Sequence, residues 1–150
     1  MVSIQVEHWF PSGRSLVFNY VSDHERFLAA PGLVCKVAEP GSTDRNGNDA
    51  IRVVRSGLMS FRERVIDFDP EQRFGYRIED IRFAGLRMPF QHEGGLLEFA
   101  DLANGTRVRW TSRLAITMPL LGGFLERDFQ ARATHLFAGL LRTAAQKLST

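Results

Sequence analysis

The amino-acid sequence predicts an α+β fold in which a curved antiparallel sheet of about seven strands wraps around a long C-terminal helix. Three observations predict it. Residues 2–10 alternate between two kinds of side chain, residues 33–116 contain six more strand-like segments, and residues 119–148 repeat apolar side chains every three or four positions. Strands joined by short turns pair antiparallel, and such a sheet curls around a helix that covers it.

The first thirty residues are predicted to hold one strand and two short helices. The strand covers residues 2–10 and ends at the Pro-Ser-Gly sequence of residues 11–13. Residues 14–30 carry apolar side chains at helical spacing, and Ser22 or Asp23 can cap a second helix. We therefore expect two short helices that meet near Ser22, followed by a turn at residues 31–32.

Six further strands are predicted from runs of β-forming residues separated by turn formers. We interpret Asn46-Gly47 as a hairpin turn, and we expect turns at Asp69-Pro70-Glu71 and Ala103-Asn104-Gly105. Residues 80–89 lack a clean period and are expected to form a surface loop that either gates a cavity, together with Gly122-Gly123, or packs onto the core. The strands are expected at residues 33–38, 50–56, 61–68, 73–79, 90–99 and 106–116.

A long helix is predicted for residues 119–148, with Pro119 in its first turn, where the missing amide hydrogen costs nothing. At about 45 Å it must lie across several strands. Its apolar side chains fall within an arc of about 160°. They are Leu125, Phe129, Ala133, Leu136, Phe137, Leu140, Leu141, Ala144 and Leu148. The whole chain, residues 1–150, is expected to be one domain.

Composition narrows the classes of function. The 19 basic and 17 acidic residues are interspersed, so no nucleic-acid-binding surface is expected. Twelve Phe residues against two Tyr favour an apolar core or pocket. The lone Cys35 allows no internal disulfide, which is typical of a cytoplasmic protein. Neither an export signal nor a membrane span is predicted, because no apolar run is long enough.

Three motifs, in order, carry a resemblance to a known superfamily. They are FNYVSDHERFLA from residue 18, FRERVIDFDPEQRFGYRI from residue 61, and GTRVRWTSRL from residue 105. With the element order, they resemble the START-domain, pollen-allergen and polyketide cyclase/dehydrase superfamily, also called SRPBCC, which has the helix-grip fold. The resemblance implies an apolar cavity between sheet and helix. It leaves the occupant open, because the superfamily includes lipid and quinone carriers, aromatase/cyclases, hormone receptors and chaperone regulators.

Strand alternation predicts which side chains face that cavity. In residues 106–116 it sends Trp110 and Ser112 inward, with Arg107, Arg109 and Arg113 toward water. Polar groups on apolar faces are the informative candidates, because a pocket needs a few of them to orient a ligand. Each of them could instead be a core residue whose hydrogen bonds are satisfied by neighbours. The candidate ligand-binding residues are Trp110, Ser112, Phe74, Tyr76, Phe90, His92, Phe129, Leu136 and Leu140.

Glu63 is one of four weak candidates for a catalytic group. We expect it to face inward with Phe61 and Val65, because the opposite register would bury two arginines. A buried carboxylate could act as a general base for aldol cyclisation or dehydration, its pKa raised by desolvation. The alternative is a salt bridge to a neighbouring arginine at the strand edge. The other weak candidates are His8, His92 and Tyr76.

Metal and cofactor chemistry is not predicted. The four histidines lack metal-ligand spacing, and no phosphate-binding loop, dinucleotide fingerprint or nucleophile elbow occurs.

The leading hypothesis is that the chain binds, sequesters or transports a small hydrophobic ligand, which is lipid, quinone or polyketide-like. One alternative is an aromatase/cyclase or dehydratase-like enzyme. Another is a protein-interaction module such as a chaperone co-regulator, which would show an exposed patch in place of a cavity. A homodimer is also compatible with the sequence.

Overall fold

A computed structural model describes residues 1–149 of the chain. Its strands form one antiparallel sheet in the order β1-β8-β7-β5-β4-β3-β2, and the short β6 pairs with β5. The elements are β1 (Val2–Phe10), α1 (Arg14–Val21), α2 (His24–Phe27), β2 (Leu33–Glu39), β3 (Ile51–Ser56), β4 (Met59–Asp69), β5 (Arg73–Phe83), β6 (Leu86–Arg87), β7 (Phe90–Leu102), β8 (Gly105–Ile116) and α3 (Gly122–Leu148). The predicted α+β class is confirmed.

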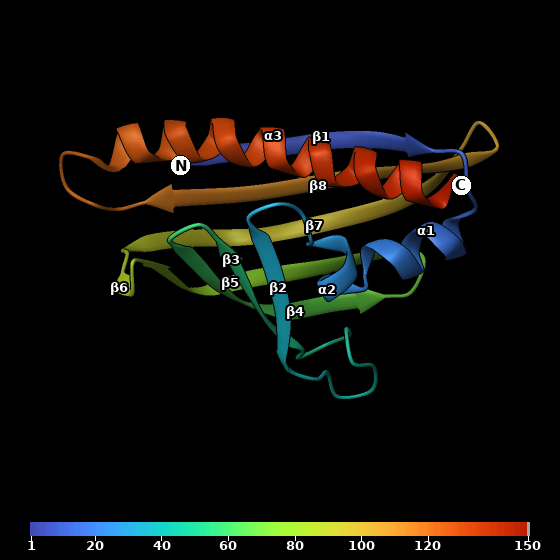
Figure 1. Ribbon diagram of the computed structural model, residues 1–150, viewed down its shortest axis with the longest axis horizontal. Helices are drawn as coiled ribbons and strands as arrows, with labels where there is room; N and C mark the ends of the chain where they lie inside the picture. The colour runs from blue at the N-terminus through green and yellow to red at the C-terminus, as the bar shows by residue number, and fades with distance from the viewer. Residues whose placement is uncertain (150) are drawn as a thin grey trace.

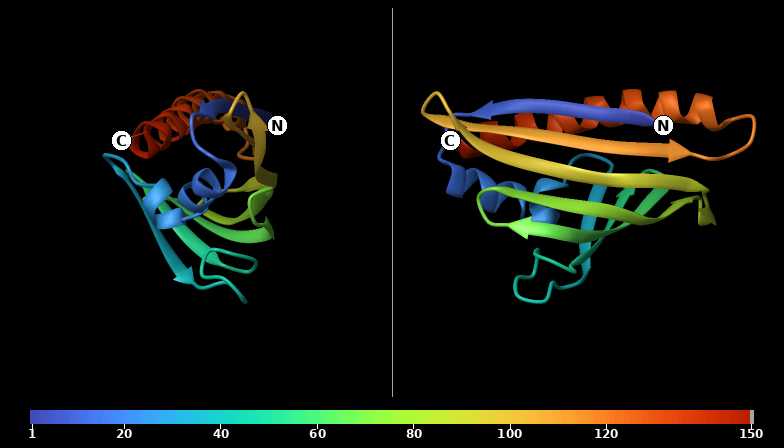
Figure 2. Two further views of the ribbon diagram at one scale, coloured as in Figure 1. Left: turned by 90° about the vertical axis from the view of Figure 1, so that its right-hand side faces the viewer. Right: turned by 180° about the vertical axis from the view of Figure 1, so that it is seen from behind.

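The sheet is curved, and α3 lies along one side of it. Figure 1 shows α3 running beside β1 and β8, at one edge of the sheet, whereas β4, β3 and β2 lead to the other edge. The end view in Figure 2 shows the strands curving round beneath α3, with the concave side of the sheet toward the helix. The contacts agree, because α3 packs against β1 and β8, while α1 touches β7, β8 and α3, and α2 packs on β2. Direct packing of helix on sheet is thus concentrated at the β1–β8 side.

Side chains alternate across the sheet as the sequence predicts. Trp110 is 2% exposed on the inner face of β8. On the outer face Arg109 pairs with Glu7 at 2.5 Å and Arg113 pairs with Glu93 at 2.8 Å. The arginines of β8 and its tryptophan therefore lie on opposite faces. Within residues 1–149, no helix has both the length and the hydropathy needed to cross a bilayer.

Most of residues 80–89 belong to a β-hairpin where a loop was expected. β5 continues to Phe83, and the two-residue turn Ala84-Gly85 leads back into β6. Both turn residues have positive φ, 50° and 83°, as a type I′ hairpin turn requires. The expectation of a loop over this whole segment is therefore wrong. Packing onto the core is wrong for Phe83 and Leu86, which are 47% and 74% exposed, but correct for Met88, which is partly buried against the core.

A β-bulge explains why the sequence pattern does not predict the second part of β5. The pairing of β4 with β5 shifts between Arg62 and Glu63, and the extra residue on β5 is Glu79. Ile78 and Ile81 are consequently both buried although they are three positions apart. This spacing breaks the period-two pattern by which a strand is recognised.

Two other boundaries differ from the prediction. α3 begins at Gly122 because Leu120, with φ of 67°, interrupts the helical backbone after Pro119. Asn46-Gly47 is not the turn of a tight hairpin, because the ladder of β2 and β3 already ends at the pair Glu39 and Ile51. Asn46 lies instead within the long loop that joins these strands.

Candidate functional site

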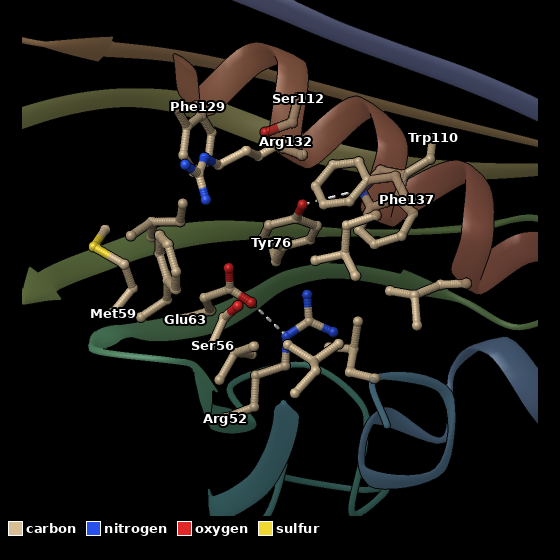
Figure 3. A pocket seen from close by; sticks show the side chains of 18 of the residues that line it. Arg52, Ser56, Met59, Glu63, Tyr76, Trp110, Ser112, Phe129, Arg132 and Phe137 are labelled. Carbon is tan, nitrogen blue, oxygen red and sulfur yellow. Dashed lines mark hydrogen bonds and ion pairs between the residues drawn. The ribbon is translucent and has the colours of Figure 1, made fainter. Parts of the chain in front are cut away.

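A cavity of about 380 Å³ lies between α3 and the strands β2, β3, β4, β5 and β8 (Figure 3). Its volume falls in the range of roughly 300–1,000 Å³ that is usual for small-molecule sites. The apolar lining residues are Leu28, Leu33, Val54, Met59, Phe61, Ile78, Phe129, Ala133, Leu136, Phe137 and Leu140. The lining residues with polar groups are Arg52, Ser56, Glu63, Tyr76, Trp110, Ser112, Arg132 and His135.

A buried ion pair forms the floor of the cavity. The Arg52 Nε donates to Glu63 Oε1 at 2.8 Å, and the two side chains are only 3% and 9% exposed. Burial raises the pKa of Glu63, and the Arg52 guanidinium partly opposes that rise. In Figure 3 the second carboxylate oxygen points away from Arg52 and into the cavity. Glu63 therefore offers one unshared hydrogen-bond acceptor to whatever occupies the space.

His24 holds Arg52 from behind. The Arg52 Nη1 lies 2.9 Å from His24 Nδ1, and His24 Nε2 lies 2.9 Å from the Asn46 carbonyl oxygen. Because a guanidinium can only donate, Nδ1 accepts and the proton sits on Nε2. Burial and the Arg52 charge hold the pKa of His24 well below its usual value, so the ring is neutral. The loop between β2 and β3 is thus tied to the cavity floor.

A second polar group, on the sheet side of the cavity, centres on Tyr76. The Trp110 indole donates to the Tyr76 hydroxyl at 3.0 Å. The hydroxyl of Ser112 also interacts with that of Tyr76. Burial raises the pKa of Tyr76, so its hydroxyl keeps its proton. The Arg52 guanidinium carbon lies 4.5 Å from the centre of the Tyr76 ring, which links this group to the ion pair.

Gly95 makes room for Tyr76. The two residues are direct neighbours on β7 and β5, and a Cβ built on Gly95 would overlap the Tyr76 ring. The ring can lie across β7 toward β8 only because residue 95 has no side chain.

His92 supports the Tyr76 group without lining the cavity. The ladder between β5 and β7 runs from Arg73 to Tyr76 and goes no further, so the Ile78 amide loses its strand partner. That amide donates to His92 Nδ1 at 2.9 Å, and His92 Nε2 lies 3.0 Å from the Ser112 hydroxyl oxygen. Burial lowers the pKa of His92 to about 4, in keeping with a neutral ring whose proton sits on Nε2.

Two aromatic contacts connect α3 with the sheet across the cavity. Phe137 stacks on Trp110 with ring centres 3.7 Å apart and planes 4° from parallel. The ring centre of Phe129 lies 6.1 Å from that of Phe61 on β4. The two phenylalanines of α3 are eight residues apart, which is about 12 Å along a helix. Toward solvent, the exposed residues Arg132 and His135 border the opening.

The structure brings together most of the residues predicted for the site. Those that line the cavity are Trp110, Ser112, Tyr76, Glu63, Phe129, Leu136 and Leu140. Glu63 faces inward as expected, but its salt bridge is inside the cavity and not at a strand edge. Because Arg52 and Glu63 form a pair, both the carboxylate and its cation are compensated.

Four predicted residues do not line the cavity. Phe74 is fully buried in the core, where its ring centre lies 6.2 Å from that of Phe99. Phe90 lies at the start of β7, and His92 lies behind Ser112. His8 faces inward on β1, and its ring centre lies 5.6 Å from that of Phe10. The cavity does not extend to this part of β1. Alternation gives the face of each residue correctly but not its distance along the strand from the cavity.

Sequence reasoning missed Arg52, the partner of Glu63. A signal for it exists, because Gly57-Leu58 is a two-residue turn that pairs Ser56 with Met59. Counting back from that turn places Arg52 directly opposite Glu63. The part of the chain that the structure describes contains no group of three or more His, Cys, Asp or Glu side chains placed to hold a metal ion.

Fold and cavity define a helix-grip protein with an internal, mainly apolar site. The chain belongs to the polyketide cyclase / dehydrase and lipid transport family, whose model matches residues 1–150. Among proteins with curated functions, none matches the sequence.

Several solved structures share the fold. TTHA0849 from Thermus thermophilus has a TM-score of 0.74 and 19% identity, over 99% of this chain and 100% of that chain. A START superfamily protein from Mycobacterium smegmatis has a TM-score of 0.73 and 14% identity, over 98% and 97%. Ara h 8.0201 has a TM-score of 0.69 and 12% identity, over 99% of each chain. At these identities the likeness concerns the fold alone.

Proposed function

We propose that the chain binds a small hydrophobic molecule, lipid, quinone or polyketide-like, in the cavity under α3 and sequesters or carries it. The observation that supports this is a cavity of about 380 Å³ whose wall is mainly apolar. The family includes lipid transport in its description, which agrees with the proposal. We place the protein in the cytoplasm, because its lone cysteine, Cys35, is buried and unpaired. A homodimer stays a prediction.

Equilibrium dialysis with naphthalene tests the proposal. The wild type is expected to bind it saturably. The variant Ala133→Leu places extra volume in the cavity wall and should weaken binding at least fivefold, because the added atoms occupy the ligand's space. The matched control Ala131→Leu lies on the exposed side of α3 and should leave binding unchanged. Absence of saturable binding, or equal binding by both variants, would contradict the proposal.

A second candidate is an enzyme that removes a proton from a carbon next to a carbonyl, as in dehydration or cyclisation. It is favoured by the raised pKa of Glu63, caused by burial, in the same cavity as the Tyr76 hydroxyl. His8 and His92 have no part in it, because neither lines the cavity. In D₂O, Glu63 would catalyse exchange of the methyl protons of 2-acetylnaphthalene for deuterium, followed by NMR. Exchange that persists in Glu63→Gln would remove this candidate.

The interaction-module alternative has less support. It predicts an exposed patch in place of an internal cavity, whereas the chain has a cavity. The exposed side chains Leu120, Leu121 and Phe124 at the start of α3 do not by themselves specify a partner.

A further inference from the structure

Each hydrogen-bond donor and acceptor around Tyr76 can be assigned, and the donors left without an acceptor limit the kinds of ligand that fit the cavity. The Ile78 amide is a fixed donor, so His92 must accept it at Nδ1 and carry its own proton on Nε2. That proton is donated to the Ser112 hydroxyl oxygen at 3.0 Å. The Trp110 indole is also a fixed donor, and it uses one acceptor position of Tyr76 at 3.0 Å.

The hydroxyls of Tyr76 and Ser112 each accept one of these donors and each carry a proton, and at most one of the two protons can be used in a bond between them. If Ser112 donates to Tyr76, the Tyr76 proton is left over; if Tyr76 donates to Ser112, the Ser112 proton is left over. None of the hydrogen bonds formed among residues 1–149 uses that remaining proton. Both residues line the cavity, so at least one hydroxyl proton is available to an occupant.

Glu63 supplies the complementary group. One carboxylate oxygen is held by Arg52 at 2.8 Å, and the other points into the cavity (Figure 3). The charge of the carboxylate is balanced by Arg52, so the wall presents an acceptor without a net charge. An anionic ligand group would meet this oxygen unfavourably, whereas a hydroxyl would donate to it.

We propose that the ligand is a neutral molecule with an apolar body, a carbonyl-type acceptor for the Tyr76–Ser112 hydroxyl pair and a hydroxyl-type donor for Glu63. The spacing of Phe129 and Phe137, about 12 Å along α3, fits a body of two or three fused rings. A pure hydrocarbon would leave both polar groups unsatisfied, and a fatty-acid anion could accept from the hydroxyl pair but would leave Glu63 without a donor and place a second anion in the cavity. The inference rests on the proposed binding function and specifies its ligand class.

Two pairs of probes separate the two polar groups. 2-Acetylnaphthalene and 2-ethylnaphthalene differ in a carbonyl oxygen, and 2-naphthol and 2-methoxynaphthalene differ in a donor hydrogen. Each Kd is measured by isothermal titration calorimetry at neutral pH with the full chain. 2-Naphthoate, an anion of the same size, is expected to bind more weakly than 2-acetylnaphthalene.

The hydroxyl count predicts an unusual pattern among variants. Tyr76→Phe and Ser112→Ala each keep one hydroxyl proton, so each should weaken 2-acetylnaphthalene binding less than twofold. The double variant removes both and should weaken it about three- to tenfold, the worth of one hydrogen bond, with 2-ethylnaphthalene unaffected. A loss shared equally by both probes would overturn the inference, since the hydroxyls would then only shape the cavity.

Glu63 is tested by removing its charge together with that of Arg52, so that neither is left buried alone. The double variant Arg52→Met, Glu63→Leu should abolish the preference for 2-naphthol over 2-methoxynaphthalene that the wild type shows. A wild type without that preference would overturn the donor part of the inference. If no naphthalene probe binds the wild type, the proposed binding function itself fails.

Discussion

The two halves of the sheet meet α3 in different ways. On the β1–β8 side the helix packs directly on the strands, and Ile4, Leu114 and Leu141 are at most 1% exposed. On the β3–β5 side a cavity separates helix from sheet, and the wall contains the charged pair Arg52 and Glu63. Direct apolar packing adds stability, whereas a cavity and a buried ion pair do not maximise it. The difference indicates that the first half maintains the fold and the second serves binding.

The largest expected effect comes from separating the buried ion pair. Glu63→Gln leaves the Arg52 charge buried without its partner, and should lower the free energy of unfolding by about 3–5 kcal/mol. Urea denaturation measures it. The matched change Glu7→Gln, in the exposed pair with Arg109, should leave stability unchanged within error, because exposed ion pairs contribute little. Equal effects at both positions would erase the distinction between the two environments.

The next effect compares two leucines of α3. Leu141 is fully buried on the packed side, so Leu141→Ala should cost about 2–5 kcal/mol in unfolding free energy. Leu136 lines the cavity and is only partly buried, so Leu136→Ala should cost less than half as much while changing probe affinity. Chemical denaturation and dialysis measure the two quantities. If Leu136→Ala proved the more destabilising, the cavity side would be the better packed half.

The smallest effect depends on pH. His92 has a pKa of about 4 in the fold against 6.5 unperturbed, so its contribution to stability is complete above pH 6.5 and is lost as the pH falls toward 4. The wild type should therefore lose more stability over this interval than His92→Gln, whose amide can replace both ring hydrogen bonds. Glu63 titrates in the opposite sense and His24 in the same sense, but both are present in the two proteins.

Urea denaturation at several pH values measures this difference, and NMR titration of the His92 ring gives its pKa directly. A His92 pKa near 6.5 would show that the ring does not hold the Ile78 amide as described.

Much of this fold can be predicted from local patterns, because the two-residue period of a strand and the 3.6-residue period of a helix depend only on residues close in sequence. The segment after Ile78 was missed since the bulge at Glu79 shifts the alternation by one residue. Within the site, the inward face of Trp110 and Glu63 could be predicted from alternation alone. The role of His92 could not, because it depends on where β5 and β7 separate, which is set by long-range pairing.

The central claim, that an apolar molecule enters the cavity under α3, is tested most directly by the two tryptophans. Trp110 lines the cavity, whereas Trp9 is 42% exposed and its indole donates to the Leu102 carbonyl oxygen at 2.7 Å. In a ¹H–¹⁵N NMR titration with 2-acetylnaphthalene, the indole signal of Trp110 should shift saturably while that of Trp9 stays in place. A Trp110 signal that does not move, or a Trp9 signal that moves equally, would contradict the account.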